Sequence, residues 1–440
     1  MPDIVAFRPV FHEGRRVAIV GTLCHHLDVG GMSPGSYAAA ATEVFQEGLR
    51  LPPVKLFEKG KRNDALWSVI AQNVRQSATV MGDLQSQIAS LDIGAQAVQR
   101  LAAKYGAETL AAACAHFLDA SEAAMRDCIR RIPDGVYEHE DWLDDDGIDP
   151  DLPVRVHAKI TIAGDRMTVD LSGSSPEVRG PINATLASSS SAVYFAAMAA
   201  ADRPMAANAG CYRPMEIFAP EGLIVSARHP APVAHRIAPC HVLLNVLFGA
   251  LSRAIPDRMP AAYYAVSYVC SFQTKAADGA RKVLVEIEVG GCGAHPDGDG
   301  ANAHSFGMHN NASIPIEMIE SDIPVTYLGY GLAENSGGRG RHRGGLGLVR
   351  TWRIDAAEAT FTAQMDRFRF TPFGLHGGEA GARGQLVLIR DGEETPLHSK
   401  VSNMTLRIGD AIRLVTSGGG GLGPPDERSQ ETRDWDVLGG

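Results

Sequence analysis

The stretch Thr22–Ser36 reads TLCHHLDVGGMSPGS and marks the point where the character of the chain changes. Before it, residues 5–11 (VAFRPVF) and 15–23 (RRVAIVGTL) alternate in polarity as strands do, with Gly14 in the short segment between them. This pattern predicts a β-hairpin. The stretch is then the exit loop of the second strand, so it presents polar side chains from the end of a rigid element.

Two imidazoles and a carboxylate, from His25, His26 and Asp28, lie within four residues of this loop. Imidazole and carboxylate together favour zinc, manganese or iron over magnesium. Adjacent side chains of an extended segment point to opposite faces, so we expect at most one histidine to share a site with the turn. The alternative is a pair of polar residues that cap a turn, since the spacing matches no specific motif.

Composition excludes several classes of protein. The 440 residues are enough for two or three packed domains. The formal net charge is -10 and the basic residues are scattered, which argues against a nucleic-acid partner. Seven cysteines without a C-x-x-C spacing indicate reduced thiols. No signal sequence or membrane-length apolar run is evident, so we expect a cytoplasmic protein that does not contact a membrane.

Hydrophobic periodicity predicts a mixed α+β fold, with a helical N-terminal region and a strand-rich, glycine-containing C-terminal region. Helical spacing occurs in residues 36–49, 63–76, 82–106 and 108–132, and strand alternation in 154–164, 166–174, 282–291, 385–392 and 410–421. We divide the chain into a hairpin with a candidate metal loop (1–36, which the family resemblance described below implies is the remnant of a larger N-terminal domain), a helical region (37–135), a mixed region (136–280) and a β-rich region (281–440).

Three glycine-rich segments follow in the second half. Residues 290–311 contain closely spaced acids but lack the glutamate that ends a calcium loop, so they form either a polar loop or a substrate-facing one. Residues 336–347 place arginines among glycines, where guanidinium groups could hold a carboxylate or phosphate, although solvated arginines are the commoner case. Residues 418–425 (GGGGLGPP) fit G-x-G-x-x-G by count, but two prolines stand where a nucleotide-binding helix should begin.

Seven collinear blocks together resemble the hydantoinase B / 5-oxoprolinase family. They are residues 25–36, 42–60, 73–90, 220–233, 315–325, 336–350 and 418–428. The resemblance implies a hetero-oligomer with a hydantoinase A-type subunit that binds and cleaves ATP. Together the two subunits of this family open cyclic amides such as N-methylhydantoin or 5-oxoproline, and relatives are subunits of acetone and acetophenone carboxylases.

The resemblance also implies a divalent metal ion (manganese, zinc or iron) held by Asp3 and His25. In the carboxylase relatives the ligands come from an H-x-P-D segment and a later histidine, and Pro2 and Asp3 are similar to the end of that segment. The histidine of that segment would fall immediately before Met1, and the family's preceding blocks are missing. We therefore expect a sequence truncated at its N-terminus, one completed by another polypeptide, or one that has lost the metal function.

Six further residues are candidates for this chemistry: four are catalytic candidates (His26, Asp28, Arg341 and Arg343) and two are substrate-binding candidates (Asp299 and Glu317). His26 and Asp28 would fix ring orientation or a bound water beside the metal. The others are phosphate- or carboxylate-holding and substrate-contacting candidates: Arg341, Arg343, Asp299 and Glu317.

The function expected from the sequence is that of a subunit of an ATP-dependent cyclic amidohydrolase. It would open a hydantoin or 5-oxoproline-like ring by hydrolysis of a carbonyl-phosphorylated intermediate. Two alternatives stay open: a subunit of an acetone- or acetophenone-type carboxylase, and a truncated, non-catalytic scaffold for the ATP-binding subunit.

Overall fold

The protein is described here from a computed structural model of residues 2–439, apart from 276–278 and 280. It opens with the predicted β-hairpin, formed by β1 (Asp3–His12) and β2 (Arg15–His25). His12 pairs with Arg15, so the loop is Glu13 and Gly14, both with positive φ (49° and 77°), as a two-residue hairpin turn requires. One face of the hairpin packs on α2 and the other face exposes several large apolar side chains, including Phe7.

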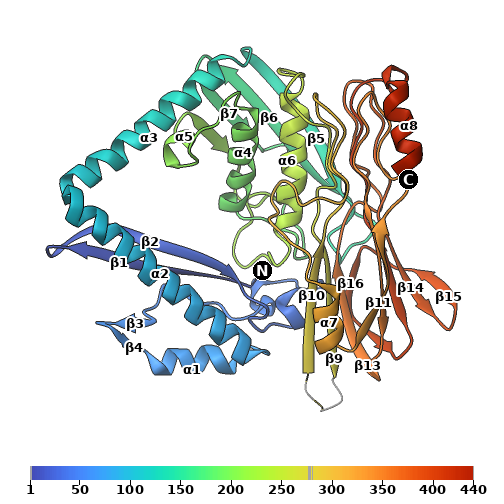
Figure 1. Ribbon diagram of the computed structural model, residues 1–440, viewed down its shortest axis with the longest axis horizontal. Helices are drawn as coiled ribbons and strands as arrows, with labels where there is room; N and C mark the ends of the chain where they lie inside the picture. Colours follow the sequence, from blue (N-terminus) through green and yellow to red (C-terminus); the bar gives the residue numbers. More distant parts are fainter. Residues whose placement is uncertain (1, 276–278, 280, 440) are drawn as a thin grey trace.

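Three helices follow, as the periodicity predicted: α1 (Asp64–Gln72), α2 (Ser77–Tyr105) and α3 (Ala107–Arg130). The Asn63 side chain caps α1 by accepting from the Leu66 amide at 3.3 Å. Gly106, with φ of 83°, separates α2 from α3. In Figure 1 the hairpin, α1 and α2 form an arm on one side of the molecule, and α3 runs from this arm back to the body.

The helix predicted for residues 36–49 was wrong. This part of the chain contains only two 3₁₀ turns, η1 (Pro34–Ser36) and η2 (Val44–Glu47), and a small two-strand ribbon, β3 (Phe57–Glu58) with β4 (Lys61–Arg62), comes before α1. Tyr37 and the alanines at 38, 39 and 41 are all buried, whichever way they face. The alanines suggested one apolar face of a helix, but they are buried because the surrounding fold encloses the whole segment. Alanine is small enough to be buried there without helical structure.

The middle of the chain forms a four-stranded sheet in the order β5 (Gly135–Leu143), β6 (Val154–Ala163), β7 (Arg166–Asp170) and β8 (Met215–Phe218). Alternate residues of β6 are buried, in agreement with the predicted strand. Helices α4 (Leu186–Ala200) and α6 (Ile237–Leu251) pack together, α6 lies against β5 and β6, and the short α5 (Ala209–Tyr212) packs on α3. Helix α6 is buried along its length, which makes it the centre of this layer.

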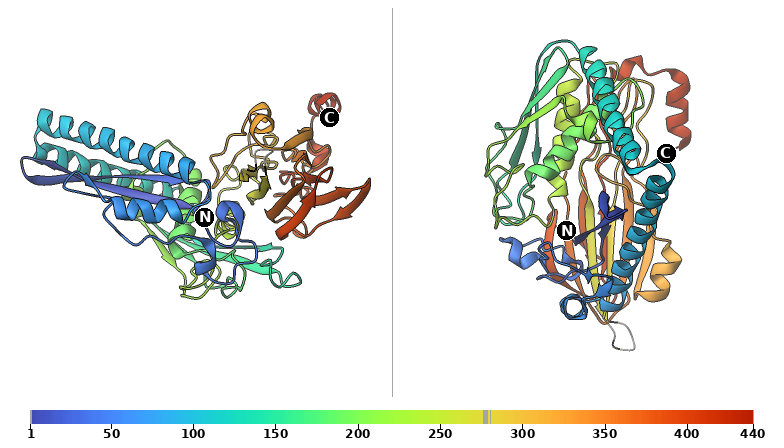
Figure 2. Two further views of the ribbon diagram at one scale, coloured as in Figure 1. Left: turned by 90° about the horizontal axis from the view of Figure 1, so that it is seen from below. Right: turned by 90° about the vertical axis from the view of Figure 1, so that its left-hand side faces the viewer.

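The rest of the chain forms a β-sandwich. One sheet has the order β10 (Arg281–Glu288), β9 (Tyr268–Lys275), β13 (Glu358–Gln364), β16 (Lys400–Arg407). The other has the order β11 (Val325–Leu332), β12 (Leu348–Ile354), β17 (Ala411–Val415), β14 (Gln385–Arg390), β15 (Glu393–Pro396). Helix α7 (Ile316–Asp322) precedes β11, and η3 (Pro425–Glu427) and α8 (Gln430–Gly439) end the chain. Figure 2 shows the arm on one side and the sandwich on the other.

The mixed α+β class is confirmed by this architecture. One continuous apolar core runs from the end of α3 through the middle sheet into the sandwich. Strands β9 and β10 pair with each other across the boundary predicted at residue 280. The four-region division of the chain stays a prediction.

Residues 418–421, the GGGG segment, lie at the centre of a glycine bundle, which we define as this segment with residues 291–294, 336–345 and 373–379 around it. Their amides donate to surrounding carbonyls, for example Gly419 to Gly345 at 2.9 Å. A Cβ added at Gly419 would lie 1.9 Å from the Cys292 oxygen, and one at Gly420 would lie 2.0 Å from that of Phe373. The glycines are there because neighbouring backbones leave no room for side chains, and no nucleotide loop is formed.

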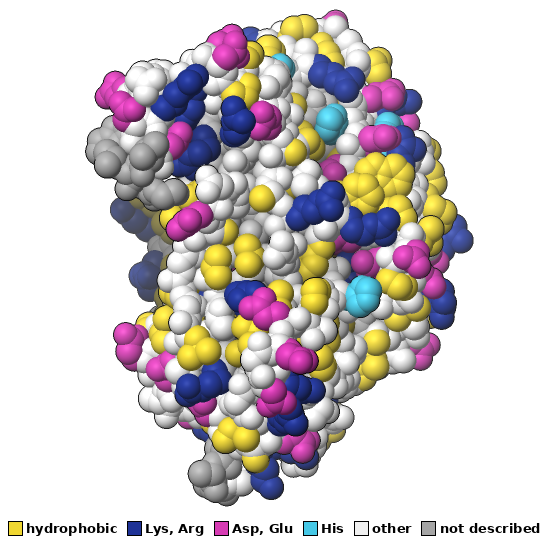
Figure 3. All heavy atoms as spheres, turned by 90° about the vertical axis from the view of Figure 1, so that its right-hand side faces the viewer, with side chains coloured by type: hydrophobic (Ala, Val, Ile, Leu, Met, Phe, Trp, Pro, Cys, Tyr) yellow, Lys and Arg dark blue, Asp and Glu magenta, His cyan; other side chains and the backbone are white. Residues whose placement is uncertain are grey.

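In the described residues, no helix is long and apolar enough to cross a membrane. The face shown in Figure 3 carries basic and acidic side chains interspersed with one another. This mixture agrees with the scattered charge read from the sequence.

Candidate functional site

Asp3 and His25, the predicted metal ligands, are brought together by the hairpin register, which pairs these two residues directly. The His25 Nδ1–H donates to Asp3 Oδ1 at 2.9 Å, and the Tyr37 hydroxyl lies 3.0 Å from His25 Nε2. The second carboxylate oxygen of Asp3 accepts from Arg236 at 2.6 Å. We call these four side chains the hairpin base. Its imidazole is about a third exposed, with 37 % of the side chain accessible, so a solute can reach it.

Charge at the hairpin base is fixed by these contacts. Burial raises the pKa of Asp3, but the hydrogen bonds from His25 and Arg236 outweigh burial and hold the pKa well below its usual range. Burial raises the pKa of Tyr37 well above its usual value. Asp3 is therefore a carboxylate and Tyr37 a neutral hydroxyl that can donate to His25 at physiological pH.

The hairpin base fits part of a metal site. Ligand atoms bound at about 2.0–2.2 Å to one ion lie roughly 3 Å apart, and the separation of His25 Nδ1 and Asp3 Oδ1 is 2.9 Å. Within the described residues, no group of three or more histidine, cysteine, aspartate or glutamate side chains is gathered closely enough to hold a metal. This chain thus offers two ligands, and their assignment stays a prediction.

His26 is separated from the hairpin base by the geometry expected of an extended segment. Its buried ring lies on the α2 side, with Nε2 3.0 Å from the Gln87 side-chain oxygen. Gln87 in turn donates to the Ile4 carbonyl at 2.9 Å. The ring Nδ1 of His26 is buried without a hydrogen-bond partner in the described structure. These contacts tie the hairpin to α2, and the catalytic role of His26 stays a prediction.

Asp28 is fully buried and organises the loop that follows β2. Its carboxylate accepts from the amides of Gly30, Gly35 and Arg75 at 2.8 to 3.0 Å. The Arg75 guanidinium adds a fourth hydrogen bond at 2.9 Å. Because the loop it holds leads into Tyr37, Asp28 acts on the hairpin base through the backbone. Direct participation in chemistry stays a prediction.

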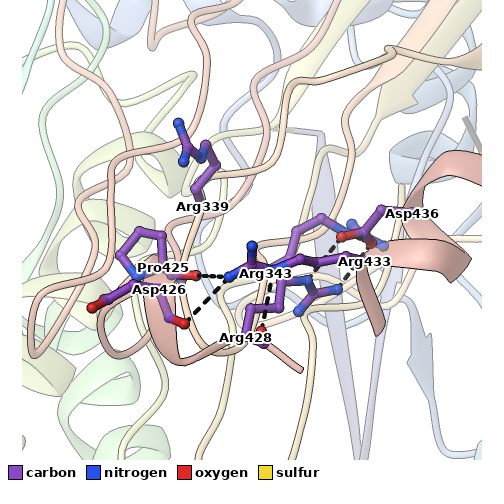
Figure 4. A pocket seen from close by; sticks show the side chains of 8 residues that line it. Arg339, Arg343, Pro425, Asp426, Arg428, Arg433 and Asp436 are labelled. Carbon is purple, nitrogen blue, oxygen red and sulfur yellow. Dashed lines mark hydrogen bonds and ion pairs between the residues drawn. The ribbon is translucent and has the colours of Figure 1, made fainter. Parts of the chain in front are cut away.

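The predicted arginine and aspartate candidates lie elsewhere, beside α8. Arg343 lines a hollow of about 530 Å³ together with Arg339, Arg428 and Arg433. Asp299 lies beside this hollow, where it accepts from the Arg343 amide. Asp299 accepts two hydrogen bonds from Arg428, at 2.8 and 2.7 Å, and one from the Arg343 amide at 2.7 Å. Figure 4 shows Arg343 and Arg428 bonded to Asp436, and Arg433 bonded to the Pro425 and Asp426 carbonyls, with Arg339 apart from them.

Most charge in this arginine hollow is already paired. Burial raises the pKa of Asp299, but the hydrogen bonds from Arg428 and Arg343 hold it below its usual value. Arg341 is about half exposed and lies 3.8 Å from Glu427. Glu317 is exposed in the first turn of α7. The structure brings Asp299 and Arg343 together, but Figure 1 shows α8 at the right-hand edge of the molecule and the hairpin strands β1 and β2 to the left of the sandwich.

Tyr37 and Arg236 are site residues that sequence reasoning missed. Tyr37 directly follows the Ser36 turn, so its position after an unusual glycine-rich loop was a usable signal. Arg236 immediately precedes α6, and it meets Asp3 across 233 residues of sequence. No local pattern could have indicated that contact.

Comparison with known proteins identifies the class of protein. The family described as Hydantoinase B/oxoprolinase matches residues 1–425, so this chain belongs to that family. Caprolactamase subunit beta of Pseudomonas jessenii is 31% identical to it, covering 100% of this chain and 77% of that protein. 5-Oxoprolinase 1 of Arabidopsis thaliana is 30% identical, covering 96% of this chain and 34% of that protein.

Solved structures agree with this assignment. The crystal structure of the ATP-dependent caprolactamase from Pseudomonas jessenii matches with a TM-score of 0.92 at 29% identity, covering all of this chain and 77% of that one. A nucleotide-free acetone carboxylase structure matches with a TM-score of 0.91 at 19% identity, covering all of this chain and 65% of that one. At that identity the second match shows the shared fold alone.

Proposed function

We propose that this chain is a subunit of an ATP-dependent enzyme that opens a cyclic amide ring. The supporting observation is the hairpin base, an accessible imidazole oriented by a carboxylate, in a chain whose family includes hydantoinases and oxoprolinases. The partner is a hydantoinase A-type subunit that binds ATP, and the two form a hetero-oligomer.

ATP is needed because an amide carbonyl is a poor electrophile. Transfer of the γ-phosphoryl group to the carbonyl oxygen, on the partner subunit, gives a phosphorylated intermediate and ADP. Water then adds to the activated carbon, the ring C–N bond breaks, and the nitrogen leaves as an amine with a proton. Hydrolysis of the resulting acyl phosphate by a second water yields the carboxylate and phosphate.

The hairpin base positions water for this attack. Asp3 orients the His25 ring through Nδ1, Tyr37 holds its Nε2 side, and Arg236 keeps the Asp3 carboxylate in place. A divalent ion held by Asp3 and His25 would take the place of the hydrogen bond between these two side chains, and it would supply a Lewis acid that lowers the pKa of a bound water.

The test uses the complex of this chain with its ATP-binding partner. His25→Ala should lower ATP-dependent opening of hydantoin, 5-oxoproline or caprolactam by about 100-fold or more, with folding and partner binding intact. His12→Ala, on the same hairpin but away from its base, is the control and should retain full activity. Unchanged turnover in His25→Ala, or incorporation of labelled bicarbonate without ring opening, contradicts the proposal.

A further inference from the structure

A second cavity lies at the open edge of the β-sandwich. It has a volume of about 250 Å³ and is bounded by β10 residues 285–288, the segment 310–314 and Arg350 of β12. Strands β10 and β11 are the edge strands of the two facing sheets (Figure 1). We call it the β10 cavity. It takes no part in the chemistry proposed at the hairpin base.

Arg350 brings unused hydrogen-bond donors to this cavity. Its side chain is only 2 % exposed, and its Nη1 donates to Glu286 at 2.7 Å and also to Glu288. Within the described structure its Nε and Nη2 have no hydrogen-bond partner. The Tyr330 ring covers one face of the guanidinium at 4.1 Å. Buried donors without partners are costly, so a ligand that accepts from them gains binding energy.

The two carboxyl groups beside Arg350 differ in what they offer. Glu286 is fully engaged, because its second oxygen accepts from Trp352 at 2.6 Å and Tyr327 at 2.7 Å. Among the described residues, the Glu288 side chain has a hydrogen bond with Arg350 alone, so its second oxygen is open to another partner. Burial, together with the Glu286 charge, raises the pKa of Glu288 to about 8 despite Arg350. At neutral pH Glu288 is therefore mostly a neutral acid beside the ion pair of Arg350 and Glu286.

The opposite wall supplies another free donor. The Asn311 side-chain nitrogen is buried without a partner in the described structure, while its backbone amide donates to Ser305 at 3.1 Å. Ile287 and Ile314 add apolar surface. The cavity is smaller than the roughly 300–1,000 Å³ typical of sites for drug-sized ligands, so its occupant is a small molecule.

We propose that the β10 cavity binds a small uncharged ring with carbonyl and N–H groups, such as a cyclic amide, imide or ureide. The carbonyls accept from Arg350 and Asn311, and a ring N–H meets Glu288. A charged ligand is disfavoured because Glu286 already balances Arg350, so its charge would be buried without compensation. The choice of ring rests on the proposed function, but the binding site itself does not.

Strand β10 separates this cavity from the loop that leads to the hairpin base. A Cβ added at Gly35, two residues before Tyr37, would lie 2.6 Å from the Val285 side chain of β10. Val285 and Glu286 are consecutive, so they point to opposite faces of the strand. A ring held by Glu288 and Arg350 is therefore close to the loop that carries Tyr37 while staying outside the His25 environment.

The test measures binding of hydantoin to the full chain by calorimetry and saturation-transfer NMR at neutral pH. Asn311→Ala should weaken hydantoin binding about five- to tenfold, and Asn311→Leu, which puts an apolar group where the donor stood, should weaken it at least as much. Asn73→Ala, at the exposed end of α1, is the control and should bind normally. 5-Oxoproline, which adds a carboxylate, should bind at least about tenfold more weakly than hydantoin.

Absence of hydantoin binding, or equal binding by the two Asn311 variants and the wild-type chain, overturns this inference. Equal binding of hydantoin and 5-oxoproline overturns the preference for an uncharged ring. His25→Ala separates the two proposals, because that variant should still bind hydantoin here. Asn311-dependent binding in a complex that opens no ring contradicts the proposed function alone.

Discussion

The glycine bundle and the hairpin base hold the chain together in opposite ways. In the bundle, backbone meets backbone, and Gly419 has a neighbouring carbonyl where its Cβ would be. At the hairpin base, side chains meet side chains, and Asp3 joins His25 and Arg236 from distant parts of the sequence. The first arrangement is set by steric exclusion between backbones. The second is set by charge and hydrogen bonding, and its imidazole is partly exposed.

This difference predicts how each region responds to change. A close-packed glycine of the bundle should tolerate no side chain, and any substitution at such a glycine should act on folding. A hairpin-base position should tolerate shape-conserving substitutions at a moderate cost in stability, and the main effect should be on activity. The following predictions run from the largest expected effect on stability to the smallest.

Gly419→Ala should break the glycine bundle. Its added methyl group would lie 1.9 Å from the Cys292 oxygen, so neighbouring backbones must move apart. We expect a loss of at least about 3 kcal/mol in the free energy of unfolding, measured by urea denaturation. Gly82→Ala is the matched control, since its Cβ would meet nothing within 4 Å in α2. It should gain about 0.5–1 kcal/mol, and equal effects at the two glycines would contradict the steric explanation.

Asp28→Asn should loosen the loop above the hairpin base. The fully buried carboxylate accepts four hydrogen bonds, and an amide group cannot accept all of them. A loss of about 1–3 kcal/mol is expected. The control is Asp92→Asn, which removes a surface ion pair with Arg8 and should cost less than about 1 kcal/mol. If chemical denaturation shows similar losses for both, the loop does not depend on Asp28.

The buried acidic segment 144–146, which directly follows β5, resembles the bundle in its burial and the hairpin base in its side-chain hydrogen bonds. Burial raises the pKa of Asp144 to about 6, and the charge of Asp366 adds to this effect while Lys400 opposes it. The folded chain thus keeps a proton that the unfolded chain releases, with a usual pKa of 3.8. The stabilising contribution is complete below about pH 4 and is lost as the pH rises through 6.

Denaturation at several pH values should show this decline and its absence in Asp144→Asn. The variant also changes hydrogen bonds to the amides of Phe368 and Arg369, so the slope with pH is the informative quantity, and the absolute stability is not. A slope that is identical in the wild-type chain and the variant would mean that Asp144 is not the responsible group.

Regular elements could be predicted where local spacing controls them. The helices within 63–76, 82–106 and 108–132 formed as expected, because each has one apolar stripe and a polar remainder. Residues 36–49 failed because their alanines are buried by the surrounding fold. The pairing of Asp3 with His25 followed from the hairpin, whereas Arg236 reached Asp3 only through the packing of α6.

The sequence by itself determined the α+β class, the hairpin and the family, because these depend on local spacing or on contiguous motifs, and the family resemblance in turn suggested His25 and Asp3 as candidate ligands. Tertiary structure alone decided that GGGG is a packing core, that Tyr37 and Arg236 complete the hairpin base, and that Arg350, Glu288 and Asn311 share a cavity. Such contacts join residues far apart in the chain. Their energy comes from burial and from hydrogen bonds that exist only once the sheets and helices have packed.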